Sequence, residues 1–286
     1  MIKRVSQIMR TDFERLNLLD SVQKAIELSL NRKQDYFPVL DQGAPIGVVT
    51  YKELLDAHPN RIIADTSVKR YPTLSLRESI WGAQNVFDHC DAGALLVMDE
   101  QELVGMLERN VLATEISTYF DPLTGLYNSS YLYSSAETLI RKGQEISIVF
   151  IDVDNFGQIN KGYGHTVGDN VLKEMAQTLK HSIPRDAYLC RYGGDEFAVV
   201  TTYDEATCKR FCMHLQRRIS SIAYSREVQV SVAVGVSGGR RGQVSLDNPV
   251  SAICNLINLA SLASTKAKDT KDKLCIEGYI DLDSIA

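Results

Sequence analysis

Apolar and polar positions follow two different periods in the C-terminal half of the chain. Continuous or alternating apolar runs predict strands at residues 146–152, 188–192, 196–202, 228–237 and 274–277. Apolar residues at helical spacing predict helices at residues 132–142, 168–182, 205–221 and 250–268. Strands and helices in this order predict an α/β (α+β) fold, in which helices surround a central mixed sheet.

The N-terminal part of the chain repeats one pattern twice. The first copy has a helix at 21–31, strands at 36–40 and 46–50, and a helix at 52–57. The second copy has a helix at 76–87, strands at 94–98 and 103–107, and a helix from residue 109. The sequence therefore predicts two small α/β units ahead of the larger domain.

The boundary between the two halves is set by a proline. Residues 109–120 contain no glycine or proline, so the helix that starts there can continue toward the next domain. Pro122 ends it, because the residue before a proline is pushed out of the helical region. We therefore expect unit one at 1–58, unit two at 59–113, a helical linker at 114–120 and the C-terminal domain at 121–286.

Composition narrows the classes of protein to which the chain can belong. Its net charge of −5 over 286 residues argues against nucleic acid as the main partner. No apolar run approaches the roughly 18 residues that a membrane span requires, and the first residues do not resemble a signal peptide. Six cysteines without a zinc-type pair read as reduced thiols. These features favour a cytoplasmic protein with no membrane and no nucleic-acid partner.

The most informative segment of the chain is a glycine pair followed by two carboxylates. Residues 191–197 read Arg-Tyr-Gly-Gly-Asp-Glu-Phe, with apolar runs on both sides. Gly193 and Gly194 predict a two-residue hairpin turn of type I′, in which both glycines have positive φ. A tip without side chains lets another molecule approach the backbone. Of the carboxylates Asp195 and Glu196, one is expected to hold a metal ion and the other to pair with Arg191.

A second carboxylate follows a buried strand. Asp152 comes directly after the apolar run 146–151, at the mouth of a predicted central strand, where sheets of this class place ligands. We expect Asp152 and Asp195 to lie at adjoining strand ends, where two carboxylates and substrate phosphates can hold Mg²⁺. A calcium loop starting at Asp152 is disfavoured because Tyr163 stands where Glu is required. A phosphate loop of the Walker type is absent from the sequence.

The C-terminal half resembles the GGDEF domain of bacterial diguanylate cyclases. The matching motifs are Asp-Pro-Leu-Thr-Gly-Leu-Tyr-Asn at 121–128, Asp-Val-Asp-Asn-Phe at 152–156, Gly-His-Thr-Val-Gly-Asp at 164–169 and the hairpin at 191–197. The resemblance implies an enzyme that condenses two GTP into cyclic di-GMP across a homodimer, with Mg²⁺ or Mn²⁺. It implies metal ligands Asp152, Asp195 and the Val153 carbonyl, catalytic Asp195 and Glu196, and substrate-binding Asn160, Asp169, Phe156, Gly193, Gly194 and Lys266.

Several positions depart from the family pattern. Gly157 stands where the family has Lys, Ser129 and Thr270 where it has Arg, and the late helix is altered. Because a charge-assisted contact contributes about 1.5–3 kcal/mol, these losses predict weak triphosphate binding. The alternative is a catalytically weak or inactive protein that acts as a GTP-binding receptor or scaffold. The Arg-x-x-Asp motif of product inhibition aligns with Pro184 and Ala187, so that feedback is not expected.

The N-terminal half resembles a tandem pair of CBS domains. The segment Gly-Val-Val-Thr-Tyr-Lys-Glu at 47–53 is similar to the nucleotide-contacting signature of that family. The resemblance implies an adenine nucleotide bound in unit one through Thr50 and Glu53. In unit two, Glu108 and Val111 stand at the corresponding positions, so we expect no such contacts there. The alternative is a dimerisation or protein-contact module without a ligand.

Overall fold

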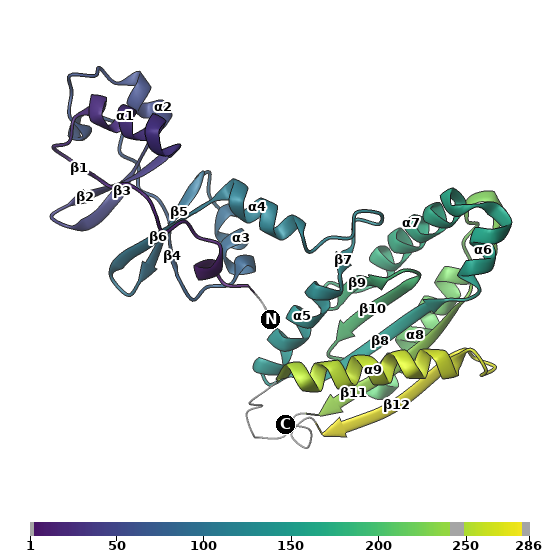
Figure 1. The fold of residues 1–286 in the computed structure, drawn as a ribbon. Coiled ribbons are helices and arrows are strands. Elements are labelled where there is room, and N and C mark those ends of the chain that lie inside the picture. Colours follow the sequence, from purple (N-terminus) through teal and green to yellow (C-terminus); the bar gives the residue numbers. More distant parts are fainter. Residues whose placement is uncertain (1–2, 241–248, 282–286) are drawn as a thin grey trace. The chain divides into compact units, whose positions relative to one another are not determined.

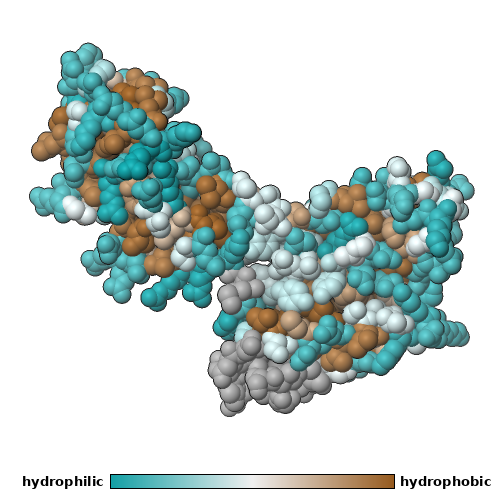
Figure 2. Space-filling view, in the orientation of Figure 1, coloured by the Kyte–Doolittle hydropathy of each residue, from teal (hydrophilic) through white to brown (hydrophobic). Residues whose placement is uncertain are grey.

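The computed structural model describes residues 3–240 and 249–281. Contacts within the chain divide it into an N-terminal unit that ends at Thr118 and a C-terminal unit that begins at Tyr119 (Figure 1). Figure 2 shows that the face in view is largely hydrophilic, with smaller apolar areas on both units. Among the described residues, no helix combines the length and the apolar character that a membrane span needs.

A six-stranded mixed sheet forms the centre of the C-terminal unit, as predicted. Its strand order is β12-β11-β8-β10-β9-β7. The four inner strands are antiparallel, whereas β12 and β7 pair in parallel at the two edges. The strands are β7 (Tyr127–Asn128), β8 (Ile146–Val153), β9 (Tyr188–Gly193), β10 (Glu196–Thr201), β11 (Val232–Arg240) and β12 (Leu274–Asp281). The strand predicted at 228–237 thus begins only at Val232.

Helices cover both faces of this sheet (Figure 1). They are α5 (Ser129–Arg141), α6 (Phe156–Tyr163), α7 (His165–Ser182), α8 (Glu205–Ser220) and α9 (Pro249–Ala267). The residues of α5 and α9 pack in one core cluster, and those of α7 and α8 in another. Sequence analysis did not predict α6, because its apolar positions are too few to give a helical period over eight residues.

The central strand β8 explains why the sheet needs helices on both faces. Its side chains alternate, so that Val149 and Ile151 enter the core beneath α7 and α8 while Ile148 and Phe150 enter the core beneath α5 and α9. All four are fully buried. On the neighbouring strand β11, a Cβ at Gly235 would overlap the backbone of α9, so glycine permits the close approach of this helix.

The N-terminal unit contains two three-stranded sheets with the same topology. The first consists of β1 (Leu16–Asn17), β2 (Tyr36–Asp41) and β3 (Ala44–Thr50), with helices α1 (Val22–Arg32) and α2 (Tyr51–Asp56). The second consists of β4 (Thr73–Ser75), β5 (Ala94–Asp99) and β6 (Glu102–Glu108), with helices α3 (Ile80–Asp88) and α4 (Arg109–Ser117). In each sheet the first two strands are parallel and the last two antiparallel.

Each repeat is completed by a segment from the other. Arg10 forms a bridge with Met106 of β6, and Lys69 forms the corresponding bridge with Val48 of β3. Short 3-10 turns precede both segments, η1 (Val5–Gln7) and η2 (Ile63–Asp65). Because the opening residues of the chain pair with the second repeat, the two repeats form a single folded body.

Candidate functional site

The carboxylates singled out from the sequence meet where β8 ends beside the β9–β10 hairpin. Antiparallel pairing places Asp152 of β8 opposite Glu196 of β10. The backbone amide of Val153 donates to the carbonyl of Asp195 at 3.3 Å, which joins the end of β8 to the hairpin turn. Asp152, Asp195 and Glu196, predicted from separate segments, therefore lie together at one edge of the sheet.

The hairpin turn differs in detail from the predicted type I′ turn. Gly193 is the last residue of β9, and the two residues of the loop are Gly194 and Asp195. Only Gly194 has a positive φ, of 46°, so one left-handed position replaces the two expected. A Cβ at Gly193 or Gly194 would meet no atom within 4 Å. Packing among the described residues therefore does not require these glycines, and the turn stays open for another molecule to approach its backbone.

Arg191 holds the turn in place instead of pairing with the hairpin carboxylates. Its guanidinium donates to the carbonyl of Gly194 at 2.6 and 2.9 Å. It also donates to both carboxylate oxygens of Asp121, at 3.0 and 3.1 Å. Burial raises the pKa of Asp121, but hydrogen bonds from Thr124 and Arg191 outweigh this effect, so the pKa is lowered overall. With this arginine engaged elsewhere, Asp195 and Glu196 remain available for a ligand.

The carboxylate cluster is electrostatically strained. Burial and the neighbouring charges of Asp152 and Asp195 raise the pKa of Glu196. Burial also raises the pKa of Asp152, and the partial compensation by Lys268 does not cancel the effect. Asp152 and Glu196 lie close together and both have raised pKa values. A bound cation would stabilise their charged forms, so cation binding is favourable at this site.

Lys268, just after α9, is the cation that the structure brings to this cluster. Its ammonium lies 2.8 Å from Asp152 Oδ1. This contact raises the pKa of Lys268. By contrast, Lys266, which sequence analysis assigned to the triphosphate, forms an ion pair with Glu277 of β12.

Sequence analysis aligned Lys266 with the conserved Lys of the family's late helix, and took Lys268 and Lys271 only as nearby lysines that could substitute in part. Moving the register of the late helix by two residues makes Ala267-Lys268 the Ala-Lys step of the family motif.

Asp154 contacts other residues than Asp152 does. Lys273 Nζ lies 2.6 Å from Asp154 Oδ2, and the hydroxyl of Ser231 donates to the same oxygen at 2.5 Å. The backbone amide of Asp154 donates to the Ser231 carbonyl at 2.9 Å. Asp154 therefore joins the end of β8 to the segments before β11 and β12.

The predicted guanine-binding residues lie on α6 and at the start of α7. A Cβ at Gly168 would overlap Oδ1 of Asn160 and come within 3.1 Å of the Phe156 ring. Asn160 and Phe156 thus lie against the first turn of α7, where glycine makes room for them. Asp169 follows immediately and is exposed. Asn155, the N-cap of α6, has a φ of 53° and turns the chain sharply after β8.

The donors at this edge of the sheet suit a hard divalent cation. Carboxylates of Asp152 and Asp195 and the carbonyl of Val153 are oxygen ligands of the kind that Mg²⁺ and Mn²⁺ prefer. In the described part of the chain, no three His, Cys, Asp or Glu side chains form a complete metal site. This matches Mg²⁺ sites that use one or two carboxylates together with substrate phosphates.

Thr50 and Glu53, the candidate nucleotide-binding residues of the N-terminal unit, cap the first turn of helix α2. Thr50 is the N-cap of α2, and its hydroxyl accepts from the amide of Glu53 at 3.3 Å. The Glu53 carboxylate accepts in turn from the amide and hydroxyl of Thr50, at 2.8 and 2.9 Å. Its other oxygen lies 2.7 Å from Lys69 Nζ. The two side chains are thus engaged within the fold, a capping box extended by an ion pair.

Residues 118–273 match the sequence model of the family described as "Diguanylate cyclase, GGDEF domain". The chain belongs to the GGDEF family. In addition, residues 5–60 match the model of the CBS domain. The GGDEF match covers every carboxylate of the site, from Asp121 to Glu196, and also Lys268.

Curated relatives share the GGDEF half of the chain. Response regulator PleD of Caulobacter vibrioides is 35% identical over 127 residues, which are 41% of this chain and 28% of that protein. Diguanylate cyclase VdcA of Vibrio cholerae is 32% identical over 121 residues, 42% of this chain and 35% of that protein. The chain therefore spans about a third of the length of these relatives.

Solved structures agree on the fold. The diguanylate cyclase SiaD of Pseudomonas aeruginosa, in complex with its activator SiaC, superposes with a TM-score of 0.50 at 27% identity, covering 58% of this chain and 64% of that chain. The coiled coil and GGDEF domain of DgcB from Caulobacter crescentus superposes with the same score at 18% identity, covering 59% and 90%. At 18% identity the second likeness concerns the fold alone.

Proposed function

We propose that this GGDEF protein is a diguanylate cyclase that condenses two GTP molecules into cyclic di-GMP. The observation that carries the proposal is the cluster of Asp152, Asp195 and Glu196 with Lys268 at its edge. Burial, with a smaller contribution from the neighbouring carboxylates, raises the pKa values of Asp152 and Glu196, so a bound cation is favourable there, and Lys268 beside them suits the phosphates that the cation also binds.

Each residue of the site has a definite part in this reaction. Asp152, Asp195 and the carbonyl of Val153 hold Mg²⁺ or Mn²⁺, and Glu196 adds negative charge beside it. The metal, when bound, polarises the α-phosphate and favours deprotonation of a 3′-hydroxyl. Asp195 lies in the turn where it can accept that proton. Lys268, 2.8 Å from Asp152, would be within reach of the phosphates of a nucleotide if a bound metal neutralised Asp152 in its place.

Recognition of guanine falls to Asn160 and Asp169. A carboxylate accepts hydrogen bonds from the N1–H and the exocyclic amine of guanine, a pattern that adenine does not offer. Phe156 packs beside Asn160 and supports this side of the site. Gly193 and Gly194 leave room for the nucleotide to lie on the turn.

The reaction requires two copies of the domain. One GGDEF domain holds one GTP, and each 3′-hydroxyl must attack the α-phosphate of the other GTP, which forms a phosphodiester bond and releases pyrophosphate. The proposal therefore includes a homodimer whose two sites face each other, with activity dependent on protein concentration.

Incubation with GTP and Mg²⁺ or Mn²⁺, with products resolved by chromatography, tests this proposal. We expect cyclic di-GMP, with a rate per protomer that rises with protein concentration. Absence of any cyclic dinucleotide at high protein concentration would refute it. A mixture of cyclic products when ATP is added would refute the assigned role of Asp169.

A second candidate is a GTP-binding receptor or scaffold with little turnover. It is favoured by Gly157, which offers no cation on the exposed face of α6. It is also favoured by Asp272, which stands at the position of the family's Arg once Lys268 takes the position of the family's Lys, and which offers no cation there. Tight binding of a non-hydrolysable GTP analogue without turnover of GTP would support this candidate over the cyclase.

For the N-terminal unit we propose a tandem CBS pair that regulates the GGDEF domain. The support is the matching strand order, 3-10 turns and exchanged segments of the two repeats. An adenine nucleotide is the proposed ligand of unit one. A thermal-shift series with AMP and ATP tests it, and a shift is expected in the full chain. Because Thr50 and Glu53 already cap α2, an unchanged melting temperature would favour a dimerisation module without a ligand.

A further inference from the structure

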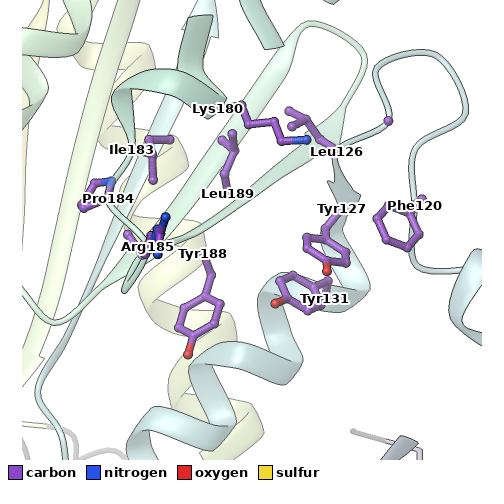
Figure 3. Close-up of a pocket in the computed structure, with 12 residues that line it drawn as sticks. Phe120, Leu126, Tyr127, Tyr131, Lys180, Ile183, Pro184, Arg185, Tyr188 and Leu189 are labelled. Carbon is purple, nitrogen blue, oxygen red and sulfur yellow. The ribbon is translucent and has the colours of Figure 1, made fainter. Parts of the chain in front are cut away.

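A cavity of about 420 Å³ lies in the C-terminal unit, apart from the carboxylate cluster (Figure 3). Its walls come from the start of this unit, from β7 and α5, and from the segment that joins α7 to β9. None of its twelve lining residues belongs to the cluster of Asp152, Asp195 and Glu196. Its volume is within the range of small-molecule sites.

One wall of the cavity is made of aromatic rings. Phe120 stacks on Tyr127 with ring centroids 4.6 Å apart, and Tyr127 stacks on Tyr131 at 3.5 Å. Tyr188 meets Tyr131 edge-on at 6.1 Å. Figure 3 shows these rings side by side, with the apolar side chains of Ile183, Leu126 and Leu189 around them. A wall of this kind packs best against a flat ring.

Two cations complete the lining. Lys180 is near the end of α7, and Arg185 lies in the following segment. Both are exposed, and within the described residues neither takes part in an ion pair. No Asp or Glu is among the residues that line the cavity. The lining therefore complements a negative charge.

We propose that this cavity binds a small flat molecule of one or two rings that carries a single carboxylate or phosphate. Pro184 and Ala187, which stand where the family's inhibitory motif has Arg and Asp, contribute apolar surface here. Recognition by an Arg and Asp pair is therefore not available in this chain. Because Tyr127 is stacked between Phe120 and Tyr131, the rings of Tyr131 and Tyr188 bind the flat part of the ligand, and Lys180 and Arg185 bind its charge.

The cavity is connected to the hairpin turn through a short series of contacts. Phe120 lines it, and the next residue, Asp121, forms the ion pair with Arg191. Arg191 in turn donates to the carbonyl of Gly194 in the turn. A ligand that holds Phe120 in place therefore stabilises the turn that carries Asp195. This regulatory consequence rests on the proposed cyclase function, whereas binding to the cavity does not.

Binding is tested with indole-3-acetate as the probe and indole-3-acetamide as its uncharged counterpart, without GTP or metal. For a ligand of this size we expect a dissociation constant of roughly 1 mM or tighter for the acid, measured by ligand-observed NMR and calorimetry. Lys180→Gln and Arg185→Gln should each weaken binding of the acid about fivefold and leave the amide unchanged. Lys173→Gln, an exposed lysine of α7 outside the cavity, is the matched control.

Three results would overturn the binding proposal. They are no binding of the acid at about 10 mM, equal affinity for acid and amide, and an equal loss of affinity in Lys173→Gln. Because the variants replace exposed side chains, loss of folding does not confuse the outcome. The binding assay does not depend on GTP turnover. The binding proposal is therefore tested even if the protein proves not to be a cyclase.

The connection to the turn is tested by hydrogen exchange. We expect indole-3-acetate to slow exchange of the backbone amides in residues 191–196 of the wild type. In Asp121→Asn, which loses the full charge that holds Arg191, this slowing should disappear while the ligand still binds. Unchanged exchange in the wild type at saturating ligand would refute the connection, whatever the rate of GTP turnover.

Discussion

Two carboxylate sites in this protein, both suggested by sequence motifs, differ in what the fold does with them. At the sheet edge, Asp152, Asp195 and Glu196 crowd one another, and Lys268 offsets only part of the burial and repulsion. In the N-terminal unit, Glu53 is neutralised by Lys69 and accepts hydrogen bonds from Thr50.

The two sites also differ in the direction of their pKa values. Burial raises the pKa of Glu53, but the contacts with Lys69 and Thr50 outweigh it, so the pKa is lowered overall. The pKa values of Asp152 and Glu196 are raised. A motif therefore indicates a ligand site most strongly where folding leaves its charges uncompensated.

The largest effect is expected from Asp195→Asn. The variant removes a charge from the proposed metal site, so GTP turnover should fall by at least about a hundredfold, measured by chromatography of cyclic di-GMP. Its melting temperature without metal should not fall, because the change relieves repulsion with Glu196. In the N-terminal unit, Glu53→Gln should leave GTP turnover unchanged. A hundredfold loss of turnover in Glu53→Gln would contradict the view that Glu53 serves the fold while Asp195 serves the reaction.

A smaller effect distinguishes two lysines at the end of α9, Lys266 in its last turn and Lys268 just after it. Lys268→Met should weaken binding of a non-hydrolysable GTP analogue with Mg²⁺ by about tenfold, because it removes a charge-assisted contact. Lys266→Met removes only an exposed pair with Glu277 and should leave the affinity within about twofold. Calorimetry measures both. If Lys266→Met has the larger effect, the assignment from the sequence is right and the register proposed above is wrong.

In the N-terminal unit we expect a loss of stability in place of a loss of activity. Glu53→Ala removes the capping box of α2 and its pair with Lys69, and should lower the free energy of unfolding by about 1 kcal/mol. Denaturation with urea measures it, with the exposed residue Lys52→Ala as the control in the same helix. A loss of AMP binding without any loss of stability would instead assign Glu53 to a ligand.

The smallest effect concerns pH. Carboxyl groups whose pKa is raised on folding favour the folded state when protonated, and this contribution is lost as pH rises through the raised pKa. Because Asp152 and Glu196 are such groups, bound metal should relieve more repulsion at higher pH. The rise in melting temperature caused by Mn²⁺ should therefore grow between about pH 5 and pH 8. A rise in melting temperature that does not change with pH would contradict the electrostatic account of the site.

The local patterns were sufficient for most of the fold. The continuous apolar run 146–151 predicted a strand buried on both faces, and β8 is such a strand. The turn was less accurate, because the bulge between Glu196 and Phe197 shifts the loop to Gly194 and Asp195. A register shift of this kind depends on the pairing between strands, and the residues of the turn alone do not encode it.

The sequence by itself determined the chemistry that this protein can attempt. Asp152 is readable as a site residue because it follows a buried apolar run, and Asp195 and Glu196 are readable because they lie between a glycine pair and the next apolar run. The tertiary structure decided which lysine contacts these carboxylates. It also decided which other carboxylates are paired within the fold. Lys268 and Lys266 differ by two residues, yet the end of α9 directs one to Asp152 and the other to Glu277. Such choices depend on helix register and on contacts across the sheet, which are set only when distant segments pack together.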